Sequence, residues 1–218
     1  MTPLRLRDLG RREYGEVLAL QRALAEERAR GEGEDTLFLV EHDEVVTVGR
    51  SAQRASRDRE GELALVRAAG VPVFEIERGG AITWHGPGQL VGYPVVRLEE
   101  GERDVHRFLR SLEGALGDAL REVAGLEADA RSEETPTGLW VQGKKVASIG
   151  IAVRRWVTLH GFALDISNDL GRFELIRPCD MAPEVMTSLV ALGVTVELDA
   201  VKQGVHRALA RRVGRQPV

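Results

Sequence analysis

The chain has 218 residues, 43% of them hydrophobic, and its 30 basic and 34 acidic side chains leave a formal net charge of −4. This length can bury a substantial core, and the charge balance argues against a general nucleic-acid binder, which would carry a basic excess. The sequence has no run of 18 uncharged apolar residues, so we expect no membrane span and no membrane partner. Cys179 is the only cysteine, which excludes an internal disulfide and a cysteine-rich zinc site. Together with an N-terminus that shows no signal-peptide pattern, this predicts a cytoplasmic protein.

Hydrophobic periodicity predicts helices and strands interspersed along the whole chain. Helical spacing is found at 14–30, 60–69, 105–123 and from Asp199, which could cap the last helix. Apolar or β-branched runs predict strands at 37–40, 45–48, 71–76, 82–84, 90–96, 139–141, 146–153 and 156–166. The runs 37–40 and 45–48 are expected to flank a turn, and the polar stretch 128–137 is expected to be a surface loop. This order lacks regular βαβ alternation and predicts a mixed-sheet α+β or α/β fold, with residues 1–218 forming a single domain.

One match to a phosphate-binding loop is misleading. Residues 138–144 fit the opening G-x-x-x-x-G-K, but Lys145 stands where the motif needs a hydroxyl that binds Mg²⁺. The intervening Leu-Trp-Val favours a strand, so we expect Gly143 to form a hairpin turn instead.

The segment RGGAITWHGPGQLVGY, residues 78–93, is the most unusual part of the chain. Its glycines permit close backbone approach to a ligand, although a tight hairpin with a bulge would also need them. Because Arg78, Thr83, His85 and Gln89 surround these turns, we favour a binding site.

Three further residues are candidates for chemistry. Cys179 lies in a loop between Pro178 and Pro183, where it is either a nucleophile or a small buried apolar residue. Lys144 and Lys145 are two of only three lysines, and they begin a strand, where one of them could be catalytic or both could be solvated. His160 interrupts a strand before Gly161 and is either a site residue or a hydrogen-bonded core residue. His42, His106 and His206 are interpreted as surface or helix residues, and the five histidines show no metal-ligand spacing.

Together these segments resemble the octanoyltransferases of lipoate biosynthesis. Residues 78–93 are similar to the signature RGGxVTYHGPGQLVGY, and residues 41–49, 136–141, 145–150, 160–163 and 176–179 resemble further blocks of that family in the same order. The resemblance extends from about residue 14 to residue 189. Four residues depart from the pattern: Glu77 replaces Asp, Trp84 replaces Tyr, Asp165 replaces Asn and Asp180 replaces Gly. Asp180 would disfavour the thiolate of Cys179 unless it is neutralised, for example by Arg177.

The resemblance implies transfer of an octanoyl group from acyl carrier protein to a lysine of a lipoyl domain, such as those of 2-oxoacid dehydrogenases and of the glycine cleavage system. It implies the fold of biotin and lipoate protein ligase catalytic domains, a mixed sheet flanked by helices. It also implies Cys179 as the nucleophile that carries the acyl thioester, and Lys145 as the residue that lowers its pKa and relays protons. Because the donor thioester is already activated, no cofactor and no metal are required. The expected substrate-binding residues are Arg78, Gly79, Gly80, Ala81, Ile82, Thr83, Trp84, His85, Ser148, Ile149, Gly150, His160, Gly161, Phe162 and Ala163.

Three alternatives remain open at this stage. An ATP-dependent lipoate or biotin ligase would share the fold but would not need Cys179. A cysteine hydrolase could pair Cys179 with His160, and a binding protein without activity would tolerate loss of the thiol. The basic run of Arg50, Arg54, Arg57 and Arg59 is either a docking surface for acidic partner proteins or a solvated loop.

Overall fold

The computed structural model describes residues 2–53, 58–130, 137–178 and 181–218, so Cys179 and Asp180 lie outside the described residues. The strands are β1 (Pro3–Arg12), β2 (Asp35–His42), β3 (Val45–Val48), β4 (Val73–Glu75), β5 (Ile82–His85), β6 (Gln89–Val95), β7 (Asp129–Ala130), β8 (Gly138–Val141), β9 (Lys144–Arg154), β10 (Val157–Asp165) and β11 (Gln216–Pro217). The α-helices are α1 (Tyr14–Ala29), α2 (Arg50–Gln53), α3 (Asp58–Ala68), α4 (Val105–Ala124) and α5 (Leu198–Arg212). None of the helices in the described ranges is both long and apolar enough to cross a membrane.

The strands form a large sheet and a small one. The large sheet has the order β11-β1-β2-β6-β10-β9-β8-β7, and the small sheet has the order β4-β3-β5. β1 is parallel to β2 and β11. The pairs β2/β6, β6/β10, β10/β9 and β9/β8 are antiparallel. The predicted mixed sheet is therefore confirmed.

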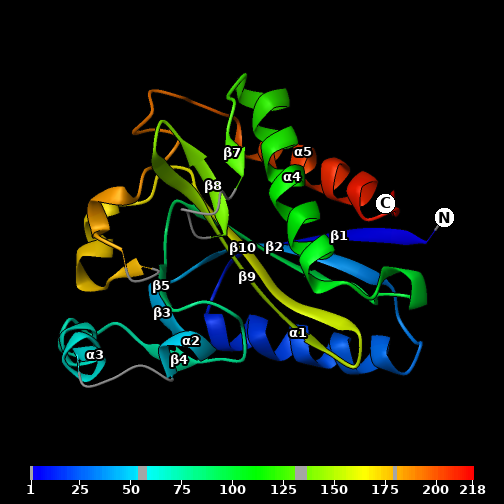
Figure 1. Ribbon diagram of the computed structural model, residues 1–218, viewed down its shortest axis with the longest axis horizontal. Coiled ribbons are helices and arrows are strands. Elements are labelled where there is room, and N and C mark those ends of the chain that lie inside the picture. The colour runs from blue at the N-terminus through cyan, green and yellow to red at the C-terminus, as the bar shows by residue number, and fades with distance from the viewer. Residues whose placement is uncertain (1, 54–57, 131–136, 179–180) are drawn as a thin grey trace.

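Helices cover both faces of the large sheet (Figure 1). α4 and α5 pack side by side over one face, which we call the α4/α5 face, and α1 lies on the opposite face together with the small sheet, which we call the α1 face. α4 buries the predicted stripe that includes Phe108, Leu112 and Leu116. Its ends follow local rules: the side chain of Asp104 accepts a hydrogen bond from Arg107 N (3.0 Å), and Gly125 ends the helix in the left-handed region.

The structure adds to the predicted elements and corrects some of them. The runs 37–40 and 45–48 flank a bend as expected, but the two strands do not pair with each other, because β2 belongs to the large sheet and β3 to the small one. β5 and β6 are divided in the same way. β1 was not predicted, although Leu4 and Leu6 alternate with Arg5 and Arg7. Asp129–Ala130 pairs with β8 as a strand, whereas residues 131–136 of the predicted loop lie outside the described residues. Asp199 lies in the first turn of α5 and does not cap it.

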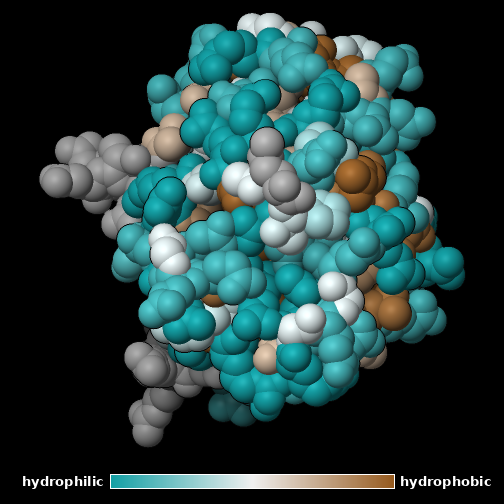
Figure 2. Space-filling view, turned by 90° about the vertical axis from the view of Figure 1, so that its right-hand side faces the viewer, coloured by the Kyte–Doolittle hydropathy of each residue, from teal (hydrophilic) through white to brown (hydrophobic). Residues whose placement is uncertain are grey.

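The surface that Figure 2 shows is mostly hydrophilic, with a few separate hydrophobic spots. The hydrophobic side chains are gathered inside, in one cluster beneath α4 and α5, a second beneath α1, and a third that joins α3 to the small sheet.

Candidate active site

A narrow cavity of about 50 Å³ lies on the α1 face, between the small sheet and strands β6, β9 and β10. Its walls come from segments that are far apart in the sequence. They consist of Tyr14, Ile76, Arg78, Gly80, Ile82, Thr83, His85, Val91, Tyr93, Ser148, Ile149, Gly150, His160, Gly161, Phe162 and Ala163. The fold thus brings together the three sequence blocks around residues 78–85, 148–150 and 160–163.

All of the predicted substrate-binding residues except Gly79, Ala81 and Trp84 line this cavity. Trp84, expected in an apolar tunnel, instead packs against Phe173 with ring centroids 5.6 Å apart, and its indole N–H donates to Glu44. Ala81 belongs to the same buried cluster as Trp84. The amide of Gly79 donates to the carbonyl of Ile151 (2.9 Å), so it is not available to a substrate oxyanion.

Arg78 is buried and fixes the glycine turn. Its guanidinium donates to the carbonyl and hydroxyl oxygens of Thr47, at 3.0 and 3.1 Å, and to the carbonyl of Gly79. Gly80 adopts a left-handed φ of 83°, which only glycine takes without strain. The Arg-Gly-Gly triplet therefore holds this wall of the cavity in place through backbone contacts.

A buried polar chain runs from His85 to the end of β10. His85 Nδ1 donates to Gln89 Oε1 (2.8 Å), and Gln89 Nε2 donates to Asp165 Oδ1 (2.9 Å). Burial lowers the pKa of His85 to about 3, so the ring is neutral at physiological pH. A neutral ring at this wall can donate or accept a hydrogen bond but cannot supply positive charge.

His160 is buried in an unusual backbone conformation. Its φ is 60°, its amide donates to Gln21 Oε1 (3.0 Å), and its Nε2 lies 3.7 Å from Glu77 Oε2. Burial lowers the pKa of His160, while the neighbouring carboxylate of Glu77 opposes this shift. The following Gly161 packs its Cα against Gly92, where a side chain would collide with the carbonyl.

Sequence reasoning missed Tyr14, Ile76, Val91 and Tyr93 as wall residues. It also placed His42 on the surface, which is wrong: the residue is fully buried. His42 Nδ1 lies 3.0 Å from the carbonyl of Arg12 and therefore donates, so its Nε2 accepts from the hydroxyl of Tyr93 (2.8 Å). The ring of Tyr14 stacks with that of His85 at 6.2 Å. Val91 and Tyr93 lie within the segment 78–93, and His42 lies within the block 41–49, so these three stood in segments that the sequence analysis had identified.

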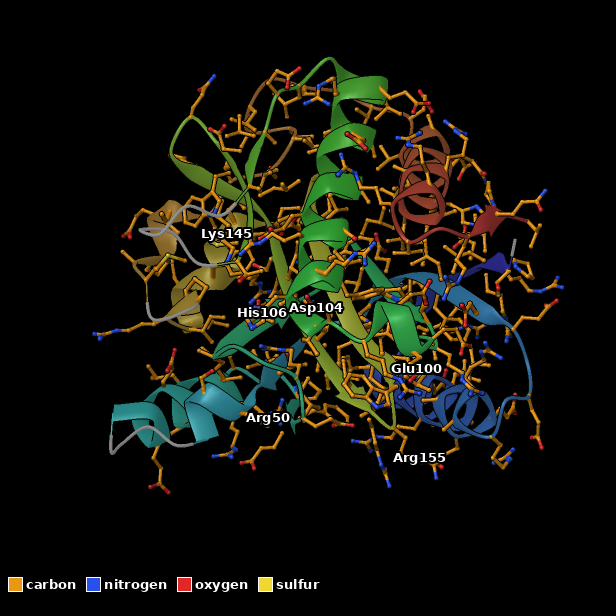
Figure 3. All side chains as sticks on the ribbon, turned by 45° about the vertical axis from the view of Figure 1, so that its right-hand side comes forward. Arg50, Glu100, Asp104, His106, Lys145 and Arg155 are labelled. Carbon is orange, nitrogen blue, oxygen red and sulfur yellow. The ribbon has the colours of Figure 1, made fainter. Side chains whose placement is uncertain are left out.

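Lys145 is fully buried, whereas Lys144 is exposed. Figure 3 shows Lys145 in the interior of the molecule, beside the segments that follow β10. Its Nζ lies 5.7 Å from the ring centroid of Trp140, and its carbonyl accepts from the amide of Thr187 (2.9 Å).

The structure describes the residues that flank Cys179 but not the cysteine. Pro178 is buried, and its carbonyl accepts from the amide of Met181 (3.1 Å). Met186 forms a parallel bridge with Lys145. The chain that continues from Cys179 is therefore fixed to the backbone of Lys145 within seven residues.

A larger cavity of about 460 Å³ lies elsewhere, between α5 and the ends of β1, β6 and β10. Of the residues predicted to form a site, its walls contain Gln89 alone among those that the structure describes. Its charged side chains have partners, since Lys202 pairs with Asp8 (2.6 Å) and Arg11 with Asp43 (2.7 Å). We therefore assign the site to the narrow cavity and Lys145.

Comparisons with known proteins identify the family of the chain. The family model described as the lipoyl protein ligase A/B catalytic domain matches residues 13–210. An octanoyltransferase of Geobacter metallireducens is 45% identical over 201 residues, which cover 92% of this chain and 89% of that protein. An octanoyltransferase of Solibacter usitatus is 44% identical over 209 residues, covering 94% and 91%.

Among solved structures, lipoate-protein ligase A bound with ATP superposes with a TM-score of 0.73 at 19% identity, covering all of this chain and 89% of that one. This likeness confirms the predicted fold. The chain therefore belongs to the lipoyl protein ligase A/B catalytic domain family and, within it, to the octanoyltransferases.

Proposed function

We propose that the protein transfers an octanoyl group from acyl carrier protein to the ε-amine of a lysine in a lipoyl domain, with Cys179 as nucleophile and Lys145 as proton carrier. One observation carries the proposal: a fully buried lysine lies on β9, the strand whose residues 148–150 line the cavity, and is fixed to the chain segment that follows the only cysteine. Buried lysines are rare and exchange protons readily. The names of the relatives support octanoyl as the transferred group.

The reaction needs two acyl transfers. In the first, the Cys179 proton passes to the Lys145 amine, and the thiolate attacks the donor thioester. The new Cys179 S–C bond replaces the donor C–S bond, and the departing thiolate takes the proton from Lys145. In the second, the acceptor amine forms a C–N bond, the Cys179 S–C bond breaks, and the amine proton passes through Lys145 to the sulfur. Both steps balance without ATP.

The cavity suits the acyl chain rather than the reacting carbonyl. Ile76, Ile82 and Val91 supply apolar wall, and the glycines at 150 and 161 leave space for a chain beside the sheet. An octanoyl group placed here would extend along β10, away from Lys145.

The expected partners are acyl carrier protein and the lipoyl domains of 2-oxoacid dehydrogenases and of the glycine cleavage system. We expect residues 1–218 to form one catalytic domain that binds these partners in the cytoplasm. Of the basic run, the structure describes the side chain of Arg50 alone; it is exposed, and its amide donates to the carbonyl of Arg78 (3.0 Å). Arg54, Arg57 and Arg59 stay a prediction, because their side chains lie outside the described set.

Intact-mass spectrometry tests the proposal directly. Mixing the protein with octanoyl acyl carrier protein should add one octanoyl group, which hydroxylamine removes and which prior alkylation with iodoacetamide prevents. The adduct should be absent from Cys179→Ala. An adduct that persists in Cys179→Ala would overturn the assignment of the nucleophile.

A second candidate function is an ATP-dependent lipoate or biotin ligase, because a structure of the same fold is bound with ATP. That activity would exchange pyrophosphate into ATP in the presence of free octanoate or lipoate. Such exchange, retained by Cys179→Ala, would favour the ligase.

A further inference from the structure

Asp165 is a buried carboxylic acid at the end of β10, and the mechanism above does not use it. Its side chain is 1% exposed and accepts a hydrogen bond from Gln89 Nε2. Burial raises the pKa of Asp165 to about 7, against the lowering effects of Gln89 and Lys145. A carboxyl group of this kind can hold either charge state near neutral pH.

A β-bulge turns Lys145 toward the same face as Asp165. Leu139 pairs with Ala147 and both belong to the core on the α4/α5 face, yet the next residue of β8, Trp140, pairs with Lys145 rather than with Val146. Successive side chains of β8 alternate, so Trp140 faces the α1 face, and Lys145 lies over its ring. Without the extra residue in β9, Lys145 would share the face of Ala147.

Asp165 reaches the α1 face by simple alternation. Leu164 pairs with Ala147 and lies in the core on the α4/α5 face, so the next side chain of β10 points the opposite way. Lys145 and Asp165 are thus buried on one face, at the ends of two neighbouring strands. The electrostatic effect of Lys145 on the carboxyl group is consistent with this placement.

The segment Thr187–Leu189 holds the two strand ends together. The amide of Thr187 donates to the carbonyl of Lys145 (2.9 Å), and the amide of Leu189 donates to the carbonyl of Asp165 (3.0 Å). Because Cys179 precedes this segment by only eight residues, the same chain links the nucleophile, the lysine and the carboxyl group.

We propose that Asp165 is a positioning residue, whose carboxylate, held by Gln89, stabilises the ammonium form of Lys145 in the octanoyl transfer. The inference rests on the proposed function, because it assigns a partner to the proton carrier of that reaction. Asp165 forms no bond to the substrate. Its negative charge favours the ammonium form of Lys145, so the ammonium persists during attack by the thiolate.

Other charged groups near the pair define the controls. Glu113 of α4 accepts from the amide of Gly138, close to Lys145, but is paired with Arg110. His85 reaches Asp165 only through Gln89 and is neutral. Asp180 is the sequence neighbour of the thiol, so Asp180→Asn is the matched control that removes a different carboxylate.

The test measures the two half-reactions separately as a function of pH, in the wild type, Asp165→Asn and Asp180→Asn. Acylation of Cys179 by octanoyl-pantetheine is followed by intact mass, and transfer from the acylated protein is followed with a lipoyl domain. Asparagine can still accept the hydrogen bond from Gln89, so the fold should persist. Asp165→Ser serves as the second variant if Asp165→Asn is unstable.

Loss of the negative charge should make the ammonium form of Lys145 less stable. In Asp165→Asn, the alkaline limb of the pH–rate profile of acylation should therefore move to lower pH by about one unit. The acid limb of the pH–rate profile of the second transfer should move in the same direction by the same amount. Asp180→Asn should move only the acid limb of acylation, which reports the thiol.

A purely structural role would reduce both rates without moving either limb, and that result would overturn the inference. Failure of the proposed function is a different outcome. In that case the wild type would form no adduct at Cys179, or Lys145→Met would leave both limbs unchanged.

Discussion

The ring of Phe162 on β10 fills the space beside Gly92 on β6, so that a Cβ at position 92 would lie 2.1 Å from Phe162 Cζ. The two residues are cross-strand partners, and the ring belongs to the core beneath α4 and α5. Glycine at position 92 is therefore a condition for the position of this ring in the core.

Gly92→Ala should displace the ring of Phe162 in the core beneath α4 and α5. We expect the free energy of unfolding to fall by about 1–3 kcal/mol from overpacking. Urea unfolding checks this.

The double variant Gly92→Ala/Phe162→Leu should lose less stability than the two single variants together, because leucine leaves room for the new methyl group. Gly61→Ala on α3, where a Cβ would meet nothing within 4 Å, is the control. Additive losses in the double variant would rule out the ring as the cause.

Lys145 and Lys144 should differ sharply in mutagenesis. Lys145→Met, which keeps the volume of the buried stem, should lose most transfer activity, while Lys144→Met should stay within a few-fold of the wild type because its side chain is exposed. Steady-state transfer to a lipoyl domain is the measurement. Equal losses in both variants would remove Lys145 from the mechanism.

Acidification should destabilise the protein between pH 6.5 and about 4. Burial lowers the pKa of His42 from 6.5 to about 4 and that of His85 to about 3, so in this range the unfolded chain binds protons that the folded protein does not. Each such histidine contributes a slope of about 1.4 kcal/mol per pH unit, with stability rising as pH rises. Asp165, with its raised pKa, contributes the opposite slope between pH 4 and 7 because the folded state keeps the proton.

Replacing His42 by Gln should therefore flatten the dependence of unfolding free energy on pH by up to about 1.4 kcal/mol per unit. Urea unfolding at pH 5, 6 and 7 measures this slope, and His106→Gln, at an exposed position on α4, is the control. An unchanged slope in His42→Gln would contradict the prediction, whatever the change in absolute stability.

Asp35 is fully buried, and its charge should make Arg215, near the C-terminus, important for stability. Its carboxylate accepts from Arg28 Nε (2.9 Å) and Arg215 Nε (2.8 Å). Arg215→Leu would leave this buried charge with one guanidinium partner fewer, and we expect a loss of about 3 kcal/mol in urea unfolding. Arg5→Ala breaks an exposed pair with Glu34 and should cost less than about 1 kcal/mol; comparable losses in the two variants would contradict the argument.

Local sequence pattern predicted most of the secondary structure, and it marked the blocks around residues 78–85 and 160–163 as parts of the site. The stripe of α4 follows from residue spacing, because one amphipathic face defines the helix. β9 and β10 follow from their apolar runs. The block 78–85 could be recognised by its glycines and polar side chains, and Lys145 by its similarity to a family motif. These signals are local, so they can be recognised without knowledge of the fold.

Only the tertiary structure decided which strands pair and which way the critical side chains point. Apolar runs mark β2, β3, β5 and β6 as strands, but they do not say that the chain crosses between two sheets at residues 43–44 and 86–88. The direction of Trp84 and the burial of His42 depend on partners far away in the sequence, Phe173 and Tyr93. The bulge that turns Lys145 toward Asp165 lies between two neighbouring strands, but the residue spacing does not mark it. Such contacts are selected by packing and burial across the whole core, a free energy that a window of sequence does not contain.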